Sequence, residues 1–292
     1  MTPVDFCCDP DEATVPLPHS WEHTIGSDHA AMALRTEYQD QLKRCHDELG
    51  IRHVRCHGLL SHDMGTLVAH GRNQIVSFRN AHSIWNFLLD NGMKPFVEVS
   101  VMSDAIASNQ TTVFHYRGNV TPPKRYADWA DLIRLLARRA VDRYGISEVA
   151  TWPFEIWNEP DMRGFWRRTR EQYLRLYANA ARGLKEVHLD IPVGGPATAQ
   201  NAWIDEFLDF SERRDVPVDF VSTHHYPTDA TVKTSSDPDI QLAHAQRGIL
   251  REEALNARLA AHAASRSTTP SGTRRRTRAT RCTTSRTPQR SS

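Results

Sequence analysis

Short apolar runs alternate with amphipathic stretches along most of the chain. Runs of five to ten residues predict β-strands, and stretches with apolar residues three or four positions apart predict helices. The predicted strands are Ile51–Leu60, Lys94–Val101, Pro153–Trp157, Ile191–Gly195 and Asp219–Tyr226, with Val4–Cys7 as a further candidate. The predicted helices are Leu34–Leu49, Ser83–Asn91, Tyr126–Tyr144, Thr169–Val187 and Trp203–Arg213.

Strands that alternate with helices of this length indicate parallel βα units and an α/β fold. About six units over some 250 residues suit a (β/α)8 TIM barrel that is incomplete, with its last βα units missing. A doubly wound sheet is the structural alternative, but no glycine-rich phosphate loop follows the first strand. We therefore expect a partial barrel over residues 1–262 and no cofactor.

The last 30 residues break this pattern. Residues 263–292 hold eight Arg and no Asp, Glu or Lys, so the remaining chain carries −7 of an overall charge of +1. Arg, Ser and Thr make up 22 of these 30 residues, and such a segment buries too little surface to offset its ordering entropy. We expect a disordered basic tail.

Composition places the rest of the chain among globular proteins. Hydrophobic residues are 39% and charged residues 24%, and no apolar run approaches the roughly 20 residues that span a bilayer. The start, MTPVDFCCDPDE, lacks the basic and apolar regions of a secretory signal, so we expect a cytoplasmic protein without a membrane partner. Five irregularly spaced cysteines indicate neither a disulfide framework nor a zinc site.

The strongest local signal is the segment FEIWNEPDM. An apolar strand runs into Asn158 and Glu159, and alternation predicts that Glu155, Trp157 and Glu159 share one side of the strand. Glu159 then lies at the carboxyl end of a strand, which is the active-site rim of a (β/α)8 barrel. A carboxyl group at that rim can serve as the acid catalyst of a glycosidase, although a surface Asn-Glu-Pro turn is an equal alternative.

Neighbouring strand ends strengthen the catalytic interpretation. His224 and Tyr226 fall on one face of a strand end, where they can bind sugar hydroxyl groups, and His57 ends another strand. Adjacent His224 and His225 point to opposite faces and chelate poorly, so we expect no metal site. Trp166 can stack on a sugar ring, and packing under the following helix is the equally weighted alternative.

Four stretches together resemble glycoside hydrolase family 39, the β-xylosidase and α-L-iduronidase family. They are SWEHTIGSDHAAMAL (Ser20–Leu34), RCHGLLSHDM (Arg55–Met64), FEIWNEPDMRGFW (Phe154–Trp166) and FVSTHHYP (Phe220–Pro227). The resemblance implies a (β/α)8 barrel that cleaves glycosides with retention. It makes Glu159 the acid/base, Asn158 a sugar ligand, and His57, His224 and Tyr226 further residues of the same subsite. The stretch RCHGLLSHDM is more similar to the bacterial β-xylosidases than to the iduronidases, which implies xylo-oligosaccharide substrates.

The sequence departs from the family at its second carboxylate. The family supplies the nucleophile in a late Thr-Glu-Trp-Asn motif, and these 292 residues contain none. The last acidic residues are Glu252 and Glu253, so we expect the nucleophile to be absent and the chain to be inactive.

The tail offers an explanation in another reading frame. The codons ACA CCG AGT GGA AC(N) for Thr269–Thr273, read from each third base, spell Thr-Glu-Trp-Asn. We therefore hypothesise a frameshift at about residues 255–263, which would make the tail out-of-frame translation.

Two other functions compete with a truncated glycosidase. One is a non-catalytic sugar-binding barrel remnant that keeps the half-site of His57, Asn158, His224 and Tyr226. The other is nucleic-acid binding by the arginine tail, which the acidic body disfavours because it offers no supporting basic face. We expect a glycoside partner and no nucleic acid, and the sequence leaves the oligomeric state open.

Overall fold

One six-stranded parallel sheet organises the chain. The computed structural model describes residues 16–70, 73–199 and 201–224. The sheet has the order β1-β2-β5-β8-β9-β10, so its strands follow one another in chain order. Their bounds are Thr24–His29 (β1), His53–His57 (β2), Lys94–Val99 (β5), Phe154–Ile156 (β8), Val193–Ala199 (β9) and Phe220–His224 (β10).

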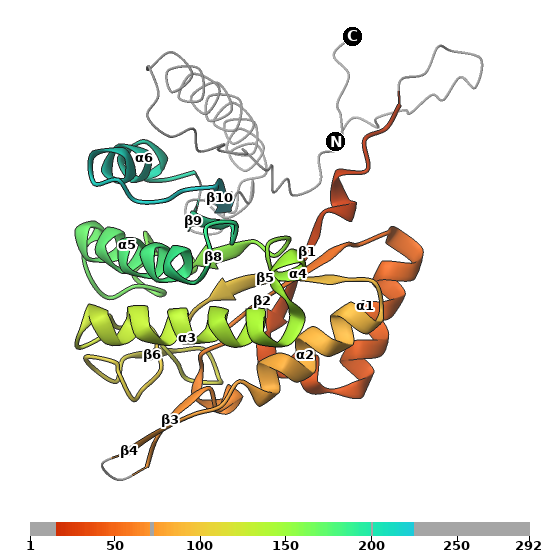
Figure 1. Cartoon of the computed structure of the whole chain (residues 1–292), viewed down its shortest axis with the longest axis horizontal. Helices are drawn as coiled ribbons and strands as arrows, with labels where there is room; N and C mark the ends of the chain where they lie inside the picture. The colour runs from red at the N-terminus through yellow and green to blue at the C-terminus, as the bar shows by residue number, and fades with distance from the viewer. Residues whose placement is uncertain (1–15, 71–72, 200, 225–292) are drawn as a thin grey trace, which may run out of the picture.

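A helix returns the chain between each pair of neighbouring strands. Every strand pair of this six-stranded sheet is parallel, as such crossovers require. Figure 1 shows the helices following one another along one side of the sheet. They are α1 (Thr36–Leu49), α2 (Arg79–Asp90), α3 (Tyr126–Tyr144) with the short α4 (Ile146–Val149), α5 (Arg170–Val187) and α6 (Ile204–Arg213). This is the βα repeat of a (β/α)8 barrel, and among the described residues β1 and β10 are the first and last strands of the sheet.

The apolar core lies between the sheet and this helix layer. Alternate residues of the central strands point outward into it, such as Val97, Val99, Phe154 and Ile156, all of them buried. Helix α3 packs along α5, and Gly183 permits this approach because a Cβ there would lie 3.0 Å from the Ala130 carbonyl oxygen.

Two short hairpins lie in the loops that follow strands of the sheet. After β2, the strands β3 (Leu67–His70) and β4 (Asn73–Val76) form an antiparallel hairpin. After β5, β6 (Thr112–Val113) and β7 (Gly118–Asn119) form a second one. Short 3-10 helices follow β1 (Ala30–Leu34) and β2 (His62–Met64), and a third, Ser20–Glu22, precedes β1 at its amino end.

The predicted elements agree closely with the observed sheet and its five longer helices, with one strand of the sheet omitted; the two short hairpins and α4 were not predicted either. Five predicted strands and all five predicted helices are present, whereas β1 was not predicted because Thr24–His29 lacks an apolar run. The candidate strand Val4–Cys7 and the basic tail lie outside the described residues. Among the described helices, none is both long and apolar enough to cross a membrane.

Candidate active site

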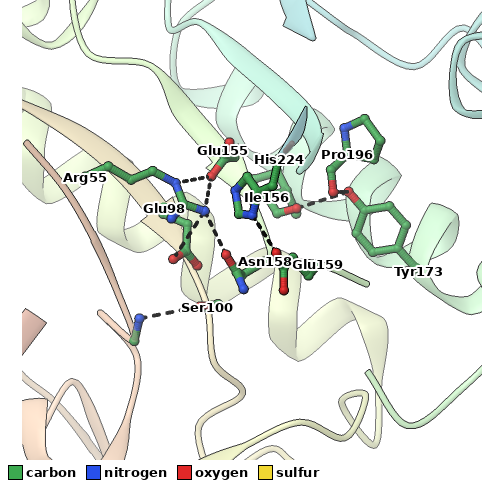
Figure 2. Close-up of polar contacts among 11 residues, drawn as sticks. Arg55, Glu98, Ser100, Glu155, Ile156, Asn158, Glu159, Tyr173, Pro196 and His224 are labelled. Atoms are coloured by element: carbon green, nitrogen blue, oxygen red, sulfur yellow. Dashed lines mark hydrogen bonds and ion pairs between the residues drawn. The ribbon is translucent and has the colours of Figure 1, made fainter. Parts of the chain in front are cut away.

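Glu159 stands just beyond the carboxyl end of β8 and faces the end of β10. Its Oε1 shares a hydrogen bond of 2.8 Å with Nδ1 of His224, the last residue of β10 (Figure 2). The Glu159 amide donates to the Ala197 carbonyl at 2.8 Å, which ties the loop to β9. Both side chains of the pair retain some exposure, 12% for Glu159 and 19% for His224. A carboxyl group held in this way can exchange a proton with a ligand at the rim.

Asn158 is oriented by an arginine from inside the barrel. Arg55, on β2, donates from Nη2 to Oδ1 of Asn158 at 3.0 Å. The same guanidinium donates from Nε to Oε2 of Glu155 on β8 at 2.6 Å (Figure 2). Because the Asn158 oxygen accepts this bond, its amide nitrogen is left to donate to a ligand.

A second buried carboxylate lies close to the same arginine. Glu98, on β5, is fully buried, and its Oε2 lies 3.7 Å from Arg55 Nη2. Neither of its oxygens accepts a hydrogen bond within the described chain. Burial raises the pKa of Glu98 to about 7; Arg55 opposes this shift and the neighbouring Glu155 adds to it. Two carboxylates and one guanidinium therefore form a charged layer under the rim.

His57, at the end of β2, borders an open pocket whose empty space, open solvent included, is about 230 Å³. Burial lowers the pKa of His57 to about 4, and the positive charge of Arg55 adds to this shift. The imidazole is therefore neutral at pH 7. The pocket is lined by His57, Ser100, Val101, Phe114, Tyr116, Trp157, Asn158 and Phe165.

The structure brings together four of the residues that the sequence predicts. Glu159, Asn158, His57 and His224 all lie at the carboxyl ends of the parallel strands. Tyr226 and His225 lie outside the described residues. Trp166 is 1% exposed and packs edge-on against Trp157 and Tyr173, so its position fits the packing alternative rather than stacking on a sugar.

The predicted alternation through the NEP segment is wrong at Trp157. Glu155 faces Arg55 inside the barrel, but the Trp157 ring packs against Trp129 of α3, in the outer layer. The backbone turns here, because Trp157 and Glu159 have φ angles of 77° and 44°. These left-handed conformations are costly for non-glycine residues and are typical of active sites.

The charged layer of Arg55, Glu98 and Glu155 was not predicted to belong to the site. Its signal was present: Glu98 and Glu155 each interrupt an apolar strand at a single position (VEV and FEI). In a barrel strand such a carboxylate must face the interior, because the other face packs against helices. Within the described residues no group of three or more His, Cys, Asp or Glu side chains could hold a metal ion.

Comparison with protein families places these features in context. The model of Glycosyl hydrolases family 39 matches residues 6–258. A β-xylosidase of Caldicellulosiruptor saccharolyticus is 49% identical over 80% of this chain and 48% of its own length. A β-xylosidase of Geobacillus stearothermophilus is 40% identical over 73% of this chain and 44% of its own length. The chain thus spans about half the length of these relatives.

Solved structures give the same assignment. A monomeric β-xylosidase from Caulobacter crescentus CB15 superposes with a TM-score of 0.72 at 34% identity. The superposition covers 83% of this chain and 51% of that enzyme.

Proposed function

Because the chain belongs to glycosyl hydrolases family 39, we propose that it carries the acid/base half of a retaining β-xylosidase-like active site. The pairing of Glu159 with His224 at two strand ends is the observation that carries the proposal. In this proposal Glu159 protonates the leaving glycosidic oxygen and later deprotonates water. Asn158, His57, His224 and Tyr226 hold the sugar, and Trp166 supports the site from the core.

The character of the pocket supports a neutral sugar. Its eight described lining residues include no Lys, Arg, Asp or Glu, and His57 is uncharged at pH 7. A uronic acid would bring a carboxylate to this wall without a cation to pair with. Xylose carries no such group, so xylo-oligosaccharides suit the pocket better than uronides.

Retention requires a second carboxylate about 5–5.5 Å from the first. The 292 residues contain no Thr-Glu-Trp-Asn segment to supply it. We therefore propose that this chain binds glycosides but does not turn them over at a useful rate. A non-catalytic sugar-binding protein is the alternative to this proposal.

An added nucleophile tests both parts of the proposal. With 4-nitrophenyl β-D-xyloside, the chain should release little nitrophenol alone and more when sodium azide is present. A single displacement inverts the anomeric carbon, so the product should be the α-xylosyl azide.

Glu159→Gln should slow azide-dependent cleavage of phenyl β-D-xyloside more than that of the nitrophenyl compound, because phenolate is the poorer leaving group. Rapid azide-independent turnover would show that a nucleophile is present, and xyloside binding without azide rescue would favour the binding protein.

The gene itself tests the origin of the missing motif. The codons for Thr269–Thr273, read from each third base, should spell Thr-Glu-Trp-Asn. If they do not, the frameshift hypothesis is wrong and the basic segment belongs to the protein.

A further inference from the structure

The hairpin of β6 and β7 brings two aromatic rings to the pocket. Its tip, residues 114–117, carries Phe114 and Tyr116, and both line the pocket together with His57. We name these three rings the aromatic wall. Neither hairpin residue was predicted to belong to the site.

The base of this hairpin is firmly fixed. Buried Asn119, on β7, donates from its side chain to Asp104 Oδ1 and to the Asn109 carbonyl, each at 2.8 Å. Its own carbonyl accepts from the Met102 amide at 2.9 Å. Gly118 allows close packing, since a Cβ there would lie 2.9 Å from the Tyr116 ring. The tip is therefore held in place from below.

Tyr116 anchors the tip to the neighbouring β1 strand. Its ring stacks on that of His29 with centroids 3.8 Å apart and planes within 2°. His29 is itself buried, and its Nε2 is hydrogen-bonded to Asp63 Oδ2 at 2.6 Å. The role of Tyr116 is thus explained by packing alone.

Phe114 is different: its ring contacts those of Tyr116 and Phe165, each with centroids 5.4 Å apart, but these contacts leave much of the residue uncovered. It is 46% exposed, and its backbone has a φ angle of 61°, a conformation that is costly for a bulky residue. Its ring lies parallel to His57, with planes within 2° and centroids 5.9 Å apart. A strained backbone therefore holds an exposed, flat apolar ring at the pocket, level with the predicted sugar ligand His57.

We infer that Phe114 is a sugar-stacking residue that receives the apolar C–H face of the pyranose bound by Asn158 and His57. This inference rests on the proposed function and names the residue that adds apolar contact to its polar half-site. Flat aromatic rings suit the apolar faces of β-pyranoses, whose ring hydroxyl groups project mainly sideways. The inference commits to a neutral pyranose, since the aromatic wall carries no charge at pH 7.

The test is the affinity of the full chain for methyl β-D-xylopyranoside, measured by calorimetry or ligand-observed NMR. Phe114→Ala should weaken binding roughly tenfold, because an aromatic contact and its buried area are lost. Phe114→Leu keeps an apolar side chain but loses the flat face, so it should weaken binding nearly as much. Phe114→Tyr should stay within about twofold of the wild type.

Leu189→Ala is the matched control. Leu189 is also a large exposed hydrophobic residue, 64% exposed, but it lies between α5 and β9 at the opposite ends of the strands. This variant should bind the xyloside as the wild type does.

Asn158→Ala separates the inference from the proposed function. If Asn158→Ala abolishes binding while Phe114→Ala and Phe114→Leu leave it unchanged, the stacking inference is overturned and the proposed function stands. If the wild-type chain shows no saturable binding, both are overturned. A comparable loss in Phe114→Leu and Phe114→Tyr would also overturn the inference, since it would show no need for an aromatic face.

Discussion

The two faces of the six-stranded sheet are both buried, but they have opposite chemistry. The outward face meets the helices through Val97, Val99 and Phe154, and these contacts are wholly apolar. The inward face carries Glu98 and Glu155 on the same two strands, one residue away from those apolar positions. The alternation of a strand thus separates the residues that stabilise the fold from those that serve the site.

The inward face is also layered along the strands. Near the amino ends, Phe96 and Phe220 meet edge-on with ring centroids 5.9 Å apart. The charged layer of Arg55, Glu98 and Glu155 comes next, and Asn158 and its neighbours stand above it at the rim. An apolar floor keeps water from the charged layer, and the charged layer in turn orients the rim. The outward face has no such order, because hydrophobic packing is not directional.

Phe154→Ala should produce the largest loss of stability. Phe154 is fully buried on the outward face of β8, and truncating a buried phenylalanine leaves a cavity that costs about 4 kcal/mol. Urea unfolding measures the effect, with Phe154→Leu as the control that should cost less than about 1.5 kcal/mol. A small effect of the alanine variant would mean that the outward face is not the stabilising one.

Arg55→Met should lower the free energy of urea unfolding by about 3 kcal/mol at pH 8, because it leaves buried carboxylates without their counter-charge. The loss should shrink at pH 5, where the raised pKa of Glu98 lets that carboxyl take up a proton. Arg134→Met is the control: Arg134 pairs with Asp131 and Glu186 on the helix surface, where ion pairs are worth under about 1 kcal/mol. Equal losses for both variants would remove the distinction between the buried inward layer and the surface.

The inward face should also show two opposed pH dependences. The pKa of Glu98 rises from 4.5 to about 7 on folding, so its contribution favours the folded state at low pH and is lost as pH rises from 4.5 to 7. The pKa of His57 falls from 6.5 to about 4, so stability is lost as pH falls from 6.5 to 4. Each effect amounts to at most about 3 kcal/mol, and between pH 4.5 and 6.5 they cancel in part.

Single variants should separate these two dependences of the unfolding free energy on pH. Glu98→Gln removes the first effect, and the unfolding free energy should then fall more steeply on acidification than in the wild type. His57→Phe removes the second effect, and the unfolding free energy should then fall as pH rises from 4.5 to 7. Unfolding measured at pH 5, 6 and 8 decides this, and parallel pH profiles for wild type and variants would refute the opposed slopes.

Much of the outward face could be predicted from the sequence, and less of the inward face. The spacing of apolar residues predicts Tyr126–Tyr144 as a helix with its observed bounds, because helix packing repeats locally. Glu159 was predicted because Asn-Glu-Pro follows an apolar strand. The Arg55–Glu155 contact joins residues 100 positions apart, and local spacing cannot predict it. Phe114 depends on a hairpin tip and a left-handed backbone, neither of which has a hydrophobic signal.

Thr169→Ala should have the smallest effect and should test whether the two faces are independent. Thr169 caps α5: its hydroxyl accepts from the Gln172 amide at 3.4 Å, and Gln172 Oε1 accepts from the Thr169 amide at 3.2 Å. Losing this capping box should cost about 1 kcal/mol in urea unfolding, and Thr169→Ser should preserve it. Xyloside affinity should not change, because α5 lies in the outer layer. The Thr169 carbonyl also accepts from the Trp166 indole at 3.0 Å, and Trp166 packs against Trp157 beside Asn158. A loss of affinity in Thr169→Ala but not in Thr169→Ser would therefore show that the outward layer reaches the site through these two tryptophans.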